Sequence, residues 1–216
     1  MLSSRLVGSR LLLALTISAL GALTPACADP SKSFDDFVAR SPAPLPPGDC
    51  PEAFASPAPG EMDGAYFVTM VTSLADAPGE EKPLTLRADI TNDAQGLGMT
   101  LQFFDSATWQ TLIGEPKIVD PVVVSEEGKF TVPLTMVPLA KEANCVNGLS
   151  VSVDVTLVGN ICGTGSFLCG DLSGKALTAE FTGTFTMQRI TDEANLPDAL
   201  LDCKQTEYTA TLCGAE

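Results

Sequence analysis

Seven cysteines are the most reactive side chains in this sequence, and their spacing decides between metal binding and disulfide formation. No two of them form a Cys-x-x-Cys pair, and the separation of Cys162 from Cys169 is not usual for zinc ligands. We therefore predict no metal and no other cofactor. The last six cysteines instead predict three disulfides, which form in oxidising compartments. The disulfide candidates are Cys50, Cys145, Cys162, Cys169, Cys203 and Cys213.

The pairing of these cysteines does not follow from their number, because six cysteines allow 15 connectivities. Closeness in the sequence favours two pairs, and the remaining cysteines then form the third. The favoured pairs are Cys162–Cys169 and Cys203–Cys213, which leaves Cys50–Cys145.

Nucleophilic catalysis lacks its usual base, because the chain contains no histidine. Within one chain this excludes Ser-His-Asp and Cys-His mechanisms. The serine in Gly170-Asp171-Leu172-Ser173-Gly174 also fails to match the Gly-x-Ser-x-Gly spacing of a nucleophile elbow. We predict that residues 170–174 form a β-turn.

Four pairs of adjacent carboxylates could supply the two acids of a glycosidase. Adjacent residues point apart, and all four pairs fall in predicted loops or in the N-terminal tether. We interpret them as solvated turns and predict that the protein is not an enzyme; an enzyme using carboxylates is the least favoured alternative. Arg87, Lys175 and Arg189 are interpreted as surface charges. The pairs are Asp35/Asp36, Glu80/Glu81, Glu126/Glu127 and Asp192/Glu193.

The net charge of −15 at pH 7 restricts the possible partners. A nucleic-acid-binding protein needs positive charge to displace phosphate counterions, so we predict no nucleic-acid partner. The acidity fits a well-solvated secreted surface, and a divalent cation or a basic partner is the alternative.

The N-terminal segment of the chain is predicted to be an export signal. Arg5 and Arg10 both precede an apolar run at residues 11–23. This run is shorter than the roughly 20 residues of a transmembrane helix and suits the apolar region of a signal peptide.

The apolar run ends in Leu23-Thr24-Pro25-Ala26-Cys27, which resembles the lipobox of bacterial lipoproteins. The resemblance implies a lipid on Cys27 and a membrane partner in the bacterial envelope, with the outer membrane favoured. Ala26-Cys27-Ala28 also fits an A-x-A signal-peptidase site. The alternative is therefore a soluble secreted or periplasmic protein that starts at Asp29.

Four divisions of the chain follow from composition. The stretch after the signal is rich in proline, which disfavours regular helix and central strand, and is predicted to be a tether pinned by Cys50. The tail is predicted to hold a short helix near Pro197 and a short strand at 207–212. The divisions are the signal segment 1–27, the tether 28–62, a β-domain 63–190 and a disulfide-pinned tail 191–216.

Apolar and polar residues alternate through the β-domain, which is typical of strands with one buried face. About nine such runs, joined by short turns, predict an all-β fold: an antiparallel meander closing into a single barrel of 8–9 strands. A β-sandwich is the alternative. Pro121 indicates an edge strand or a bulge. The predicted strands are 65–74, 84–91, 97–103, 109–113, 118–124, 130–136, 149–157, 167–172 and 177–187.

The strand alternation also predicts which side chains fill the barrel, because a one-residue shift would reverse the two faces. We expect the interior to be filled by side chains. The inward set is Leu149, Val151, Val153, Val155, Leu157, Phe181, Phe185 and Met187. The outward set is Ser150, Asp154, Thr182 and Thr184.

Two short patterns, Gly64-Ala65-Tyr66 and Phe181-x-Gly183-x-Phe185, are similar to lipocalin-type barrels. The favoured function is that of an exported, membrane-anchored lipoprotein with a non-catalytic binding or structural role at the cell envelope. The alternative is a carrier of a small apolar ligand, if Ala179 and Gly183 leave the barrel hollow.

Overall fold

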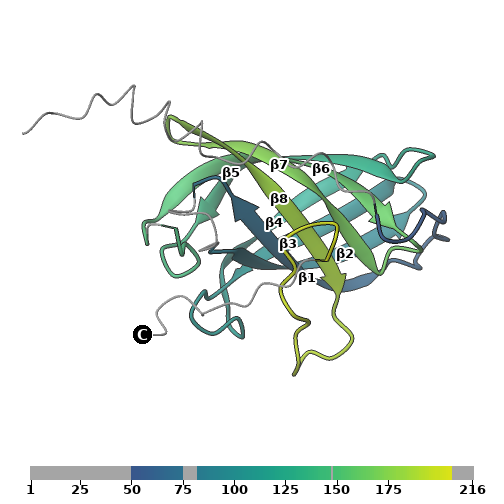
Figure 1. Cartoon of the computed structure of the whole chain (residues 1–216), viewed down its shortest axis with the longest axis horizontal. Helices are drawn as coiled ribbons and strands as arrows, with labels where there is room; N and C mark the ends of the chain where they lie inside the picture. The colour runs from purple at the N-terminus through teal and green to yellow at the C-terminus, as the bar shows by residue number, and fades with distance from the viewer. Residues whose placement is uncertain (1–49, 75–81, 147, 206–216) are drawn as a thin grey trace, which may run out of the picture. The chain divides into compact units, whose positions relative to one another are not determined.

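Eight β-strands form the fold in the computed structural model, which describes residues 50–74, 82–146 and 148–205 (Figure 1). These residues contain no helix, and hence none of the length and apolarity needed to span a membrane. The strands are β1 (Gly64–Thr72), β2 (Leu84–Asp93), β3 (Gly96–Phe104), β4 (Leu112–Val122), β5 (Lys129–Leu139), β6 (Val151–Cys162), β7 (Phe167–Ala176) and β8 (Ala179–Arg189).

The strands form one antiparallel meander. Their order in the sheet is β4-β3-β2-β1-β8-β7-β6-β5, so β1 and β8 pair although they lie at opposite ends of the β-domain. The sheet curls until its two edges, β4 and β5, approach each other, and the barrel is nearly closed (Figure 1). This confirms the predicted all-β meander barrel.

The strand β4 replaces two of the predicted strands. Residues 109–113 and 118–124 were expected to form separate strands, but Leu112–Val122 is continuous and Trp109 lies in the preceding loop. The intervening residues include Gly114 and Pro116, which suggest a break. They are accommodated because β4 lies at the sheet edge, where one side of the backbone needs no partner strand.

The strand β7 contains the predicted strand 167–172 and continues beyond it to Ala176. Residues 170–174 lie inside it, so the predicted β-turn is wrong. A Cβ atom at Gly170 would overlap the backbone carbonyl of Val158, and one at Gly174 would overlap that of Asp154. These glycines therefore permit a close approach of strands rather than a turn.

The barrel stays open along the seam between β4 and β5. In the described residues no backbone ladder joins these strands, and each of them carries two prolines, which have no N–H to donate. The prediction that Pro121 marks an edge strand is therefore confirmed. A side-chain hydrogen bond crosses the seam: Lys117 Nζ on β4 donates to the carbonyl oxygen of Thr135 on β5 at 3.1 Å.

Most of the predicted inward and outward residues lie as expected. Five inward residues are buried: Val155, Leu157, Phe181, Phe185 and Met187. Val151 and Val153 are half-buried, and three outward residues are exposed: Ser150, Asp154 and Thr182.

Leu149 and Thr184 are the two exceptions. Leu149 precedes β6, so the pleat does not direct it inward, and its side chain is 60% exposed. Thr184 points outward but is covered by the chain that follows β8, and its Oγ1 donates to the carbonyl oxygen of Leu201 at 2.6 Å. Each expectation was wrong because it assumed that alternation alone decides exposure.

Residues 190–203, the C-terminal strap, cross the outer face of β8. Thr186 Oγ1 donates to the Leu200 carbonyl oxygen at 2.9 Å, and Gln188 Nε2 donates to that of Asp198 at 2.6 Å. The predicted helix near Pro197 is wrong, because these β8 side chains satisfy strap carbonyls that a helix would satisfy internally. The predicted strand at 207–212 lies outside the described residues.

Two disulfides attach flanking segments to the strands β6 and β7. Cys50 bonds to Cys162, and Cys169 bonds to Cys203. The pairing favoured by sequence closeness is therefore wrong for these four residues. Closeness failed because each strand cysteine bonds to a segment that crosses the outside of the barrel, although the sulfurs of Cys162 and Cys169 lie only 3.7 Å apart.

The remaining cysteines complete the comparison with the expected disulfides. Cys145 is also disulfide-bonded, whereas Cys27 and Cys213 lie outside the described residues. The sulfurs of Cys50, Cys162 and Cys169 lie within 4.8 Å of one another, a grouping that could hold a metal ion as thiolates. As disulfide sulfurs they offer no thiolate.

Candidate ligand-binding cavity

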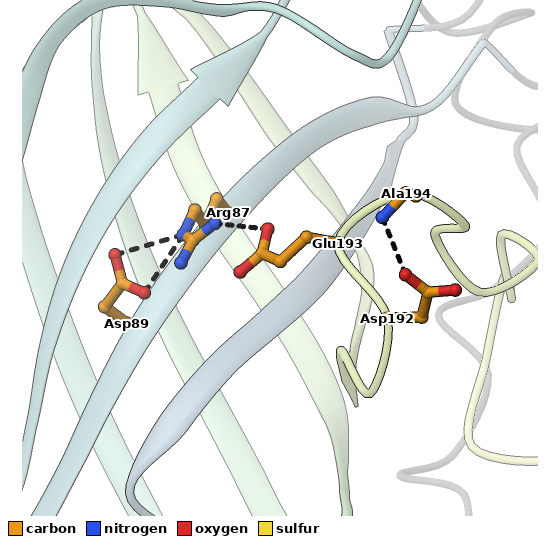
Figure 2. A network of polar contacts seen from close by, with 5 residues as sticks. All are labelled: Arg87, Asp89, Asp192, Glu193 and Ala194. Atoms are coloured by element: carbon orange, nitrogen blue, oxygen red, sulfur yellow. Dashed lines mark hydrogen bonds and ion pairs between the residues drawn. The ribbon is translucent and has the colours of Figure 1, made fainter.

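The acidic pair Asp192/Glu193 diverges, as Figure 2 shows. Glu193 Oε2 pairs with Arg87 Nη1 at 2.7 Å, and Asp192 Oδ1 accepts a hydrogen bond from the Ala194 N–H at 2.9 Å. Arg87 Nε also pairs with Asp89 at 3.0 Å. Burial by itself lowers the pKa of Arg87, but the hydrogen bonds to Glu193 and Asp89 raise it above its ordinary value. These contacts attach the C-terminal strap to β2.

The other acidic pairs do not form a described site either. Glu126 and Glu127 lie in the exposed β4–β5 turn, and Glu127 pairs with Lys129 at 2.9 Å. The Lys129 hydrogen bond and charge lower the pKa of Glu127. The pairs Asp35/Asp36 and Glu80/Glu81 lie outside the described residues.

Ser173 has no acid–base partner beside it in the sheet. It is exposed on β7, and its register partners are Thr156 on β6 and Thr182 on β8. Asp171 lies two residues away, and burial raises the pKa of its carboxyl. Among the described residues, none forms a hydrogen bond with the Ser173 hydroxyl that would activate it.

One end of the barrel, called here the closed end, carries the β2–β3, β4–β5 and β6–β7 turns. Tyr66 is fully buried there, and its hydroxyl lies 2.7 Å from the carbonyl oxygen of Gly165 and 3.0 Å from that of Met62. Burial raises the pKa of Tyr66, against the opposing charge of Arg189, so the phenol remains a hydrogen-bond donor.

The segment before β1 covers the closed end. Its residues 50–62 belong to the predicted tether, yet Met62 is fully buried, and Ala55 N–H donates to the Gly163 carbonyl oxygen at 2.8 Å. Arg189 was interpreted as a surface charge, but its guanidinium donates to the carbonyl oxygens of Glu61 (2.9 Å) and Asp63 (2.5 Å). Arg189 is therefore a clamp that ties the end of β8 to this segment.

The interior of the closed end is filled by aromatic side chains. The rings of Phe130 and Phe185 meet edge to face with centroids 6.3 Å apart. A Cβ atom at Gly159 would lie 2.6 Å from both rings, so the absence of a side chain at this position admits them. The expectation of a filled barrel is correct for this end.

The opposite end, called here the open end, contains a cavity of about 400 Å³. Its walls come from residues in or just after β1, from β2 and β3, from Lys117 on β4, from β5 to β8, from the β5–β6 loop and from the β7–β8 turn. The filled-barrel expectation is wrong here, because the inward side chains are mostly leucine and valine and do not meet across the barrel. The lining residues are Met70, Thr72, Leu74, Leu84, Leu86, Leu101, Phe103, Lys117, Leu134, Val137, Leu139, Asn144, Val146, Val151, Val153, Val155, Leu172, Ala176, Leu177, Ala179 and Phe181.

The cavity reaches the protein surface at the β7–β8 turn. Leu177 lines the cavity and is 77% exposed, and Ala179 beside it is also exposed. The backbone of Leu177 has φ 56°, a left-handed conformation that is costly for leucine. A large apolar side chain therefore stands at the mouth of an apolar cavity, at a turn position where glycine or asparagine is the usual residue.

Three polar residues interrupt the apolar lining: Thr72, Lys117 and Asn144. Asn144 is buried, and its polar atoms bind the loop that contains it: Nδ2 donates to the Leu149 carbonyl oxygen at 2.7 Å, and Oδ1 accepts from the Val146 N–H at 3.1 Å. Lys117 is half-buried and brings the positive charge at the cavity wall.

The sequence analysis did not identify Lys117. Its inward direction follows from its register with the buried Leu101 on β3, which the sequence does not reveal. The neighbouring Ile118 is apolar and yet 74% exposed on the outer face, so apolarity by itself does not mark the inward face of this strand. A lysine directly before the apolar pair Ile118-Val119 in the edge strand is the sequence signal that could have drawn attention to the site.

No protein-family model matches this chain, and no curated protein matches its sequence. The candidate site is therefore defined by the geometry of the barrel itself.

Proposed function

We propose that this protein is a non-catalytic binding protein of the cell envelope that holds a small apolar ligand in its barrel. The observation that carries the proposal is the cavity of about 400 Å³ at the open end, in which all but three lining residues are apolar. Ligand sites typically have volumes of about 300–1,000 Å³, with apolar walls and few polar groups. Such walls offer water few hydrogen-bond partners, which favours an apolar occupant.

The mouth of the cavity supports the same function. Exposing Leu177 to water and placing it in a left-handed conformation both carry a free-energy cost. Strained backbone positions concentrate at functional sites. A ligand that contacts Leu177 would bury part of this apolar surface.

Export and a lipid on Cys27 complete the proposal, with the outer membrane as the favoured location. The signal-like segment at residues 1–27 supports export, and the disulfides Cys50–Cys162 and Cys169–Cys203 fit an oxidising compartment. Intact-mass measurement of protein from the membrane fraction should show a chain that begins with a lipid-modified Cys27. A lipid-free chain that begins at Asp29 would instead establish the soluble alternative.

Titration with an apolar fluorescent probe tests the binding function. The wild-type protein should bind the probe saturably and one to one. Ala176→Trp fills the cavity from β7 and should weaken binding about tenfold or more, whereas Lys175→Trp, on the outer face of the same strand, should leave it unchanged. Gly183→Phe is unsuitable, because its Cβ would overlap the backbone carbonyl of Val71.

Two outcomes of this titration would contradict the proposal. Circular dichroism should first show that both tryptophan variants keep the β-fold. If the wild-type protein then fails to bind any probe saturably, a structural role without a ligand is favoured. If folded Ala176→Trp binds as tightly as the wild type, the cavity is not the binding site.

A further inference from the structure

The charge at the cavity wall is positive and has no described negative counterpart there. Lys117 is the ionisable side chain among the described lining residues, in a chain with 27 acidic and 12 basic residues. It points toward the cavity because its register partner on β3 is the buried Leu101. The acidity of the chain as a whole therefore does not extend to the described wall of this cavity.

The ammonium group of Lys117 has hydrogen-bonding capacity to spare. It carries three N–H donors, and one of them is used by the Thr135 carbonyl oxygen at 3.1 Å. That acceptor is neutral, and Lys117 belongs to none of the ion pairs formed by the described residues. An anionic partner would stabilise a half-buried cation that lies beside apolar walls.

The other two polar residues of the lining do not compete for such a partner. Asn144 already uses its amide to hold the β5–β6 loop, as described above. Thr72 is neutral and lies at the end of β1. An anionic group in the cavity would therefore meet one strong donor, at one place on the wall.

From this placement we infer that the ligand is an amphiphile with an apolar chain and a single anionic head group, and that the head group binds Lys117. The inference rests on the proposed binding function and names the chemical class of its ligand. The chain lies among the leucine and valine side chains of the cavity, and the head group lies at the β4–β5 seam. At about 30 Å³ for each water-sized group, a cavity of about 400 Å³ holds roughly a dozen methylene-sized groups.

The experiment compares three ligands that share a dodecyl chain and differ in head-group charge: dodecanoate, dodecanol and dodecyltrimethylammonium. Their affinities are measured by displacement of the apolar probe, below their micelle concentrations. The wild-type protein should bind dodecanoate about tenfold more tightly than dodecanol, and the cationic ligand most weakly. The preference for dodecanoate should shrink as salt is added.

Variants at Lys117 assign this preference to one side chain. Lys117→Met should lower the affinity for dodecanoate about tenfold, to the level of dodecanol, and circular dichroism shows whether the variant keeps the β-fold. Lys117→Arg should keep the preference. Lys175→Met, which removes an exposed lysine on the outer face of β7, should behave as the wild type.

The possible failures separate the two proposals. If the wild-type protein binds dodecanol and dodecanoate equally, or if Lys117→Met keeps the full preference for dodecanoate, the head-group inference is overturned and the binding function stands. If neither the probe nor any of the three amphiphiles binds the wild-type protein, the binding function itself fails.

Discussion

At the closed end of the barrel, the rings of Phe130 and Phe185 fill the interior, whereas at the open end the inward leucine and valine side chains leave a cavity of about 400 Å³. The same eight strands build both ends. The difference lies in side-chain volume and in where glycine permits close approach. At the closed end Gly159 admits two rings, while near the open end Phe181 lies against Gly174 on the wall.

The two ends also differ in what holds them. The Cys50–Cys162 disulfide, the Tyr66 hydrogen bonds and the Arg189 clamp all attach the segment before β1 to the closed end. The open end has cross-links of its own: Cys145 in the β5–β6 loop is disulfide-bonded, and Ser106 in the β3–β4 loop donates to the Glu142 carbonyl oxygen from its N–H at 2.9 Å and from its Oγ at 2.7 Å. The candidate cavity therefore lies at the end away from the segment before β1 and from the filled interior, an arrangement in which it can remain hollow.

The largest expected effect comes from truncating one phenylalanine at each end. Phe185→Ala should lower the free energy of unfolding by about 3–5 kcal/mol, because Phe185 is fully buried and its loss leaves a void. Phe103→Ala should cost less than about 2 kcal/mol, because Phe103 is half-buried and already borders the cavity. Urea unfolding with the disulfides intact measures both.

Probe binding extends this test from stability to function. Phe103→Ala changes the cavity wall and should alter the affinity for the probe, whereas Phe185→Ala should leave it nearly unchanged at temperatures where the variant is folded. Equal losses of stability from the two changes would contradict the division between a filled and a hollow end.

A smaller effect is expected from the hydroxyl of Tyr66 at the closed end. Tyr66→Phe removes a buried donor from the carbonyl oxygens of Met62 and Gly165 and should cost about 1–2 kcal/mol at pH 7. Probe affinity at the open end should not change. Urea unfolding and probe titration of the same variant measure the two effects.

The pH dependence of this variant sharpens the prediction. Burial raises the folded-state pKa of Tyr66, so its contribution to stability is fully present below the unfolded pKa of about 10 and is lost as pH rises through the folded pKa. The stability difference between wild type and Tyr66→Phe should therefore narrow above pH 10. A difference that stays constant across that range would show that Tyr66 does not titrate as its burial requires.

The inward or outward direction of a side chain was predictable where it follows from the alternation of apolar and polar residues along its own strand. Alternation correctly directed Val155, Leu157 and Phe185 inward, and the series of short turns correctly indicated a meander. The same logic failed for Leu149, which was expected to face inward and is 60% exposed, and the apolar Ile118 is 74% exposed as well. Leu149 lies before β6 begins, so the pleat of that strand does not direct it inward, whereas Ile118 lies in regular register on the outer face of β4, opposite Thr100.

Contacts between distant segments were not predictable in this way. Thr184 has the position of a solvent-facing residue, and only the strap that crosses β8 covers it. The cysteines show the same limit, because sequence closeness suggested Cys162–Cys169 while each of these residues bonds to a segment far away in the sequence.

The sequence by itself determined the fold class, because period-two alternation and turn spacing are local properties of the chain. Only the tertiary structure decided that one end of the barrel is hollow and that Lys117 lies at its wall. The physical reason is that a cavity depends on the side-chain volumes that eight strands bring together, and therefore on register. The inward direction of Lys117 depends in the same way on its pairing with Leu101, which lies on another strand.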